Sequence, residues 1–182
     1  MAIGAPSETR LWGRFEHSLD DKFRIIVPQR FRFKLGEEFV LTIGFGNGRH
    51  IRVYPMDVWN RMEEQLVSRD VHDEFDPDLV ILQRMFGSCE YASYDQQNRL
   101  SIPRHLREFA GLQEADMAVI VGSGTRLEVW SRTEWDKLFE QQITEENVLA
   151  AAMSHKRRMQ SGNQEGSEPT ADAVATRGDS AP

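Results

Sequence analysis

Apolar and polar side chains alternate over residues 15–19, near the start of the chain. This period of two predicts a half-buried β-strand. Residues 20–23 then break this pattern and predict a turn, and residues 24–27 predict a second short strand. A short helix is predicted over residues 29–35, because a proline precedes this segment and a glycine follows it.

The same order of elements occurs again in the second half of the chain. There the pattern predicts a strand over 90–94, a turn over 95–98, a strand over 99–102 and a helix over 104–110. Each half continues with a hairpin around a glycine-containing turn, since Gly and Asn tolerate the positive φ that tight hairpins require. The hairpin strands are expected at 39–43 with 50–54 and at 117–121 with 126–130.

A longer helix follows each hairpin. Pro55 begins the first one, and the run Ser131-Arg132-Thr133-Glu134 has the form of a capping box for the second. The aromatic residues at these helix starts are 76 positions apart, which indicates that one residue is inserted between the motifs. A further short helix is expected over 78–86, between the two halves.

A repeated motif accounts for this duplicated pattern. Its residues are Ser18, Asp20, Arg24, Pro28, Arg32 and Gly36, which recur 75 positions later as Ser93, Asp95, Arg99, Pro103, Arg107 and Gly111. Six identities thus fall within 19 aligned positions, where average residue usage would give on the order of one. The chain is therefore built from two related halves.

The repeat also predicts how the halves pack. A unit of about 45 residues is too small to close its own core comfortably. Two interleaved units would bury the apolar face of each hairpin and satisfy its strand edges. We therefore expect a mainly β fold with flanking helices, in which two internal repeats form a pseudo-dimer within one chain.

Composition and charge place limits on the class of protein. The 182 residues carry a formal net charge of −7, but residues 10–36 hold seven bases against three acids. This basic stretch is either an electrostatic footprint for an anionic partner or an ordinary solvated surface. No apolar run approaches the ~20 residues of a membrane span, and the first ten residues lack the apolar core of a secretory signal. The single cysteine, Cys89, fits a reducing cytosol and is expected to be a small, at least half-buried residue.

The runs at residues 17–28 and 94–103, together with the two helix starts at Trp59 and Trp135, resemble the MraZ family of bacterial transcriptional regulators. The resemblance covers roughly residues 11–145. It implies two AbrB-like swapped-hairpin domains that form one pseudo-dimeric, double-split β-barrel. It also implies a ring-shaped homo-oligomer that binds tandem G-rich repeats upstream of the division and cell-wall gene cluster.

The domain organisation follows from the repeat and this resemblance. We expect a first swapped-hairpin domain at 11–60, a helical connector at 61–86 and a second swapped-hairpin domain at 87–145. Residues 160–182 are rich in Gly, Ser, Glu, Pro and Thr and are expected to form a disordered tail.

The sequence departs from the family within the repeated turns. The family motif has a glycine before the arginine, and here that position holds Phe23 in one half and Asn98 in the other. Asn tolerates a left-handed backbone, whereas Phe at positive φ would be an outlier. The first turn is thus expected either to have a different shape or to be strained. Gln96 replaces a usual lysine, so the second turn is less basic.

Four residues are candidates for DNA contact. Arg24 and Arg99 each leave a turn at the start of a strand, and arginine binds guanine O6 and N7 through two hydrogen bonds. Lys22 and Arg14 would contact phosphates, which position a protein without reading sequence. The alternative is that Arg24 and Arg99 only pair with the aspartates of their own turns. Those aspartates are expected to have a structural role, accepting backbone N–H bonds as in an Asx-turn.

These observations favour a sequence-specific double-stranded DNA-binding regulator of the cytoplasm and nucleoid, acting as a homo-oligomer. No cofactor, metal, membrane or small-molecule substrate is expected. The alternative is an antitoxin-like protein-interaction module of the same fold that does not bind DNA. An enzyme is not expected, because the five histidines lie far apart and no phosphate-binding loop or nucleophile elbow is present.

Overall fold

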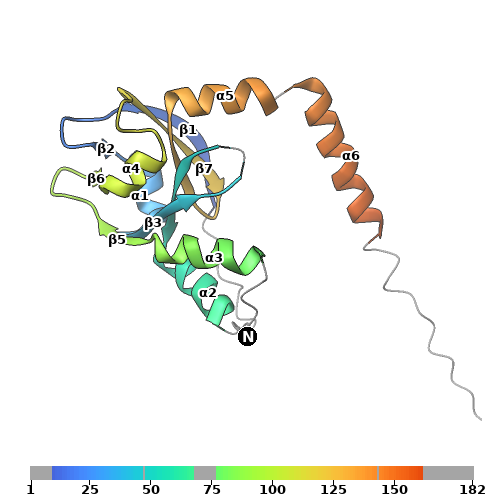
Figure 1. Ribbon diagram of the computed structural model, residues 1–182, viewed down its shortest axis with the longest axis horizontal. Helices are drawn as coiled ribbons and strands as arrows, with labels where there is room; N and C mark the ends of the chain where they lie inside the picture. Colours follow the sequence, from blue (N-terminus) through green and yellow to red (C-terminus); the bar gives the residue numbers. More distant parts are fainter. Residues whose placement is uncertain (1–9, 47, 68–76, 143, 162–182) are drawn as a thin grey trace, which may run out of the picture. The chain divides into compact units, whose positions relative to one another are not determined.

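The computed structural model describes residues 10–46, 48–67, 77–142 and 144–161. The chain divides into two compact units, Met1–Glu140 and Gln141–Pro182. The described residues of the first unit contain the strands β1 (Leu11–Ser18), β2 (Arg24–Ile26), β3 (Glu38–Gly44), β4 (His50–Pro55), β5 (Glu90–Ser93), β6 (Arg99–Ser101), β7 (Met117–Gly124) and β8 (Leu127–Ser131). The helices are α1 (Gln29–Leu35), α2 (Met56–Val67), α3 (Pro77–Gly87), α4 (Arg104–Phe109), α5 (Arg132–Gln142), which runs across the boundary between the units, and α6 (Glu145–Ser161) in the second unit (Figure 1).

The strands of the two halves are interleaved within one antiparallel sheet of six strands, in the order β1-β7-β8-β4-β3-β5. β1 of the first half pairs with β7 of the second, and β5 of the second half pairs with β3 of the first. β4 and β8 pair at the centre of the sheet, where the two halves meet. The interleaving predicted from the repeat is confirmed, because each half depends on the other to satisfy its strand edges.

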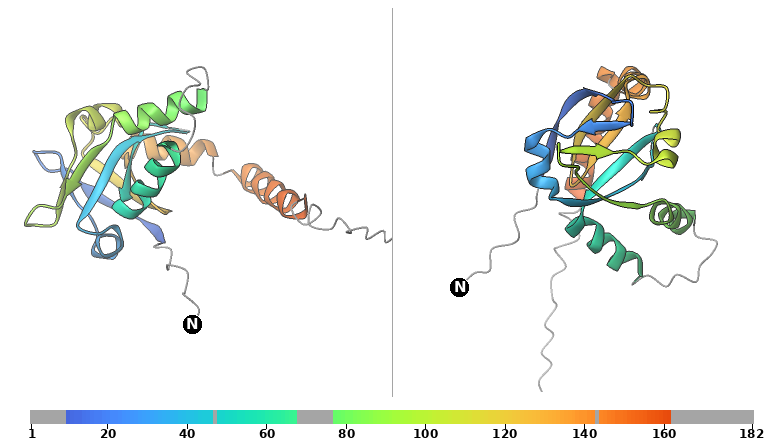
Figure 2. Two further views of the ribbon diagram at one scale, coloured as in Figure 1. Left: turned by 90° about the horizontal axis from the view of Figure 1, so that it is seen from below. Right: turned by 90° about the vertical axis from the view of Figure 1, so that its left-hand side faces the viewer.

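A second, two-stranded sheet joins the halves again. β2 and β6 pair antiparallel, with Ile25 opposite Leu100 at the centre of the register, and they lie side by side in both views of Figure 2. Both side chains are buried in the main core, which combines apolar residues from both halves, including Phe31 and Leu106 of the short helices. The two halves therefore share a single hydrophobic core.

The six-stranded sheet ends on β1 and β5. Within the part of the chain that the structure describes, these two strands do not pair, so no closed barrel is detected. The mainly β architecture with flanking helices and two repeats is shown, and barrel closure stays a prediction.

The helices α2 and α3 cover a second, smaller core (Figure 1). Trp59 lies at its centre, with no exposed surface, and packs against Tyr54 and Phe86 with ring centroids 5.8 and 4.5 Å apart. The helices expected from Pro55 and over 78–86 are both present. The capping box at α5 is half made, since the Glu134 N–H donates to Ser131 Oγ at 3.3 Å.

The insertion between the motifs is more complex than one residue. Val40 faces Tyr54 across the first hairpin, and Val119 faces Trp130 across the second. Tyr54 and Trp130 are 76 positions apart, but Val40 and Val119 are 79 apart. The prediction of a single inserted residue was therefore only the net result: the second half has four more residues before its hairpin and three fewer in the hairpin turn.

The helix α6 was not predicted. Its first turns consist largely of glutamate, alanine and leucine, which have high helix propensity. The apolar side chains Val148, Leu149 and Met153 on this helix are more than half exposed. Because they are not buried, no clear apolar face indicated the helix in the sequence. Nearly all of the expected disordered tail, from residue 162 onward, lies outside the described residues.

Candidate nucleic-acid interface

Two turns of nearly identical geometry stand side by side at one end of the first unit (Figures 1 and 2). Asp20 Oδ1 accepts the backbone N–H groups of Lys22 and Arg24, both at 2.9 Å. In the second turn, Asp95 Oδ1 accepts those of Gln97 and Arg99, also at 2.9 Å. These bonds confirm the expected structural role of the aspartates as the residues that open an Asx-turn.

Both turns have the left-handed backbone that the family glycine would favour. Phe23 has φ of 56° and Asn98 has φ of 60°. The first turn has therefore kept its shape and holds strain, since a side chain in this region costs about 1–2 kcal/mol. Two contacts offset that cost: the Arg107 guanidinium lies 4.0 Å from the centroid of the Phe23 ring, and the Phe23 carbonyl accepts the Ile102 N–H at 3.1 Å.

The motif arginines and aspartates form a crossed cluster of four charges. Arg24 Nε and Nη2 lie 2.8 and 2.7 Å from Asp20 Oδ2, and the Arg99 Nε and Nη2 atoms both lie 2.7 Å from Asp95 Oδ2. Each arginine also reaches the aspartate of the other turn, at 3.5 Å for Arg24 to Asp95 and 3.6 Å for Arg99 to Asp20. The pairing within each turn was considered from the sequence as the alternative to DNA contact. The pairing between the turns was not considered from the sequence, because it depends on the position of β2 beside β6 in the folded chain.

The cluster keeps both carboxylates ionised. The side-chain hydrogen bond from Arg24 lowers the pKa of Asp20 to about 2, with further lowering from the backbone N–H groups of Arg24 and Lys22 and opposition from burial. The backbone N–H of Arg99 is the largest cause of the lowered pKa of Asp95. All four side chains are between 23 and 33 % exposed, so the cluster remains accessible from solvent.

Lys22 and Arg14 lie in different surroundings. Lys22 is exposed at the tip of the first turn, and its ammonium group makes no ion pair or hydrogen bond with any residue that the structure describes. Arg14 lies in β1, forms an ion pair with Glu16, and places its guanidinium 5.5 Å from the centroid of the Trp135 ring on α5. The structure thus brings together Lys22, Arg24 and Arg99 but places Arg14 beside α5.

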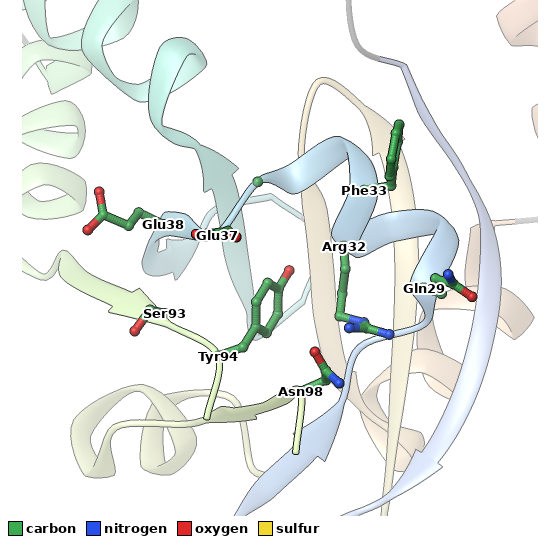
Figure 3. Close-up of a pocket in the computed structure, with 9 residues that line it drawn as sticks. Gln29, Arg32, Phe33, Glu37, Glu38, Ser93, Tyr94 and Asn98 are labelled. Atoms are coloured by element: carbon green, nitrogen blue, oxygen red, sulfur yellow. The ribbon is translucent and has the colours of Figure 1, made fainter. Parts of the chain in front are cut away.

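A recess of about 710 Å³ lies beside the second turn (Figure 3). Arg32 faces it from α1, and Tyr94 and Asn98 face it from the turn between β5 and β6. Burial raises the pKa of Tyr94, and its hydroxyl has no hydrogen-bond partner among the described residues. Asn98 occupies the place that Phe23 holds in the other half, so the aromatic ring that packs on Arg107 there has no counterpart on Arg32.

Other kinds of site find little support in the described residues. There, no group of three or more His, Cys, Asp or Glu side chains could hold a metal ion. Cys89 is half-buried, as expected, and burial raises the pKa of its thiol. None of the helices in the described ranges combines the length and the apolar character needed to cross a bilayer.

The fold and the paired turns define a class of proteins in which two copies of one β unit exchange strands within a single chain. A family model described as "MraZ protein, putative antitoxin-like" matches residues 11–78 and 85–158. The chain belongs to the MraZ family.

Curated relatives agree with this assignment. The chain is 36 % identical over 141 residues to the transcriptional regulator MraZ of Halothermothrix orenii, which covers 78 % of this chain and 94 % of that protein. It is 36 % identical over 150 residues to that of Acetivibrio thermocellus, covering 81 and 96 %. The regulator of Natranaerobius thermophilus is 41 % identical over 131 residues, covering 71 and 86 %.

Proposed function

We propose that this protein is a sequence-specific, double-stranded DNA-binding transcriptional regulator. The observation that carries the proposal is the pair of Asp-Arg turns, which presents guanidinium groups from both repeats, and the ammonium group of Lys22 from the first, on one accessible face. The names of its relatives, which are transcriptional regulators, support the same function. We place its activity in the cytoplasm, in association with the nucleoid.

Arg24 and Arg99 are proposed to read bases, and Lys22 to contact a phosphate. Arginine has five N–H donors, and the strong pairing to its own aspartate uses Nε and Nη2. The contacts of Nη1, at 3.5 and 3.6 Å, are the longer ones. The N–H groups of Nη1 and the second N–H of Nη2 are therefore the donors that a guanine could engage without breaking the turn. Arg14, beside α5, is proposed as a peripheral phosphate contact.

The architecture is proposed to be a swapped-hairpin barrel within an oligomeric ring. Ile25 of β2 and Leu100 of β6 are buried in the same core as the inner residues of the six-stranded sheet, which supports the proposal that the small sheet closes the barrel. A ring would present several copies of the paired turns to tandem promoter repeats of the division and cell-wall gene cluster. Such copies gain affinity through effective concentration.

Fluorescence anisotropy tests the proposal, with DNA from upstream of the protein's own gene and a series of salt concentrations. Lys22→Gln should lower the slope of log affinity against log salt by about one for each bound copy, because one phosphate contact is lost. Arg24→Lys, which keeps the charge but loses the two-pronged geometry, should weaken specific binding and leave non-specific binding nearly unchanged. Arg61→Gln, a charge loss on α2, is the matched control.

The proposal would be refuted by an absence of binding at low salt, or by Lys22→Gln and Arg24→Lys variants that bind like the parent. Circular dichroism of each variant establishes that it remains folded. A loss of binding in Arg61→Gln equal to that in Lys22→Gln would show that only net charge matters.

Exposed aromatic side chains favour a second candidate, the protein-interaction module. Trp12, Phe33 and Tyr91 are 60, 92 and 61 % exposed, and aromatic residues are enriched at protein interfaces. Affinity purification of the full chain tests this function. One partner protein in fixed stoichiometry, lost in Phe33→Ala, together with no retardation of DNA, would support it over DNA binding.

A further inference from the structure

The two turns form a frame with local two-fold symmetry. β2 and β6 pair antiparallel about Ile25 and Leu100, so a rotation about the centre of this pair exchanges the turns. The ion pairs obey the same symmetry, with 2.7 Å from Nη2 within each turn and 3.5 and 3.6 Å between turns. The spacing and the relative direction of the turns are therefore fixed by the fold and by the crossed charges.

Symmetry in a DNA-binding frame has a consequence for orientation. The backbone of a duplex has local two-fold axes, which is why symmetric dimers bind palindromic sites. A frame with two identical turns would bind a given duplex equally well in either direction. Any preference must come from residues that differ between the turns.

The tips of the turns differ in charge but not in backbone position. Lys22 and Gln97 are equivalent residues, and each donates its backbone N–H to the turn aspartate at 2.9 Å. Both side chains are exposed, but one ends in an ammonium group and the other in a neutral amide. Lysine neutralises a phosphate, whereas glutamine offers hydrogen bonds that suit adenine N6 and N7. The preceding residues, Asp21 and Gln96, differ as well.

The surface beneath the tips is also unequal. Phe23 fills the space below the first turn, under Arg107. Asn98 leaves the corresponding space below the second turn as the open recess of about 710 Å³, with Arg32 fixed there by an Nε hydrogen bond to the Val27 carbonyl at 3.0 Å (Figure 3). The two flanks of the frame thus present different shapes to a bound duplex.

From these differences, and resting on the DNA-binding function proposed above, we infer that one chain binds its DNA in a single orientation and that Lys22 and Gln97 set this orientation. The fold supplies a symmetric frame, and the difference between Lys22 and Gln97 gives this frame a direction.

Directed cleavage of DNA tests the inference on the full chain. Phe33 on α1 is replaced by cysteine in a Cys89→Ser background and coupled to an iron chelate that cuts nearby DNA. On a duplex from upstream of the gene, the parent should cut one flank of each bound site at least about tenfold more than the other flank. The exchange variant, Lys22→Gln with Gln97→Lys, should move the stronger cut to the opposite flank.

A matched control exchanges the same residue types on α5, as Lys137→Gln with Gln141→Lys, and should leave the stronger cut in place. Equal cutting of both flanks by the parent would overturn the inference while DNA binding stands. A one-sided cut that the turn exchange does not move would show that Lys22 and Gln97 do not set the orientation. A chain that neither binds nor cuts the duplex at low salt would instead refute the proposed function itself.

Discussion

Acidification should destabilise this protein through one buried histidine. His50 in β4 is only 3 % exposed, and its ring stacks on Trp130 with centroids 4.0 Å apart and planes 16° from parallel. The pKa of His50 is lowered to about 4, chiefly by burial and to a smaller degree by the charges of Arg52 and Arg126. Glu128, whose Oε1 lies 4.0 Å from His50 Nε2, opposes this shift without cancelling it.

The direction of the effect follows from proton binding. In the unfolded chain the His50 imidazole takes up a proton as the pH falls through about 6.5, whereas in the folded protein it stays neutral until about pH 4. The contribution of the neutral histidine to the free energy of unfolding is complete above pH 6.5 and is lost between pH 6.5 and 4. Because each pH unit within this window costs about 1.4 kcal/mol, the loss between pH 7.5 and 5.0 is about 2 kcal/mol.

Urea unfolding at pH 7.5 and pH 5.0 measures this loss. Protein concentration is held constant, since association would shift the apparent stability. The variant His50→Gln is uncharged at both pH values. Its free energy of unfolding should therefore fall by about 2 kcal/mol less than that of the parent between pH 7.5 and pH 5.0. His105→Gln, at a histidine that is 48 % exposed, is the control for the loss of an imidazole outside the core.

Absolute stabilities are not the criterion, since His50→Gln also removes the stacking on Trp130. The criterion is the change between the two pH values. If His50→Gln loses as much stability as the parent on acidification, then His50 does not titrate in this window and the reasoning from its burial is wrong.

Three further changes test the fold by urea unfolding. Gly122→Ala should cost about 1–3 kcal/mol, because its Cβ would lie 2.6 Å from the backbone of β1, whereas Gly87→Ala, in open space, should be neutral or stabilising. Asn98→Ala should cost about 1 kcal/mol and Asn98→Gly should not, because only alanine is strained at φ of 60°. Phe23→Ala should cost about 1–2 kcal/mol, since it keeps the strained backbone and loses the ring contact with Arg107. An unchanged stability in Gly122→Ala or Phe23→Ala, or equal effects of the two Asn98 variants, would contradict the contact or strain concerned.

Much of the fold could be predicted from the sequence because its signals are local. The strands at β1 and β2, the short helix after Pro28 and the hairpins depend on neighbouring residues and on backbone conformations that proline and glycine favour. The duplication added one non-local conclusion, namely that the halves interleave. The strand order confirms it, since β1 pairs with β7 and β5 with β3.

The features that were missed depend on distant residues or on the absence of burial. The sequence predicted one inserted residue between the motifs. Only the strand register showed that the second half has four more residues before its hairpin and three fewer in the hairpin turn. The exposed helix α6 gave no clear apolar face by which to recognise it. The recess beside Asn98 could have been suspected from the exchange of Phe23 for Asn98, but its walls come from segments far apart in the chain.

The sequence by itself determined that this protein has two related halves, that each carries an Asp-Arg turn, and that the aspartate organises the turn. Only the tertiary structure decided that the two turns meet and that each arginine lies between two carboxylates. The physical reason is distance. The bonds within a turn join residues four apart, whereas the crossed pairs join residues 71 and 79 apart, and these exist only because β2 and β6 pair in the folded chain.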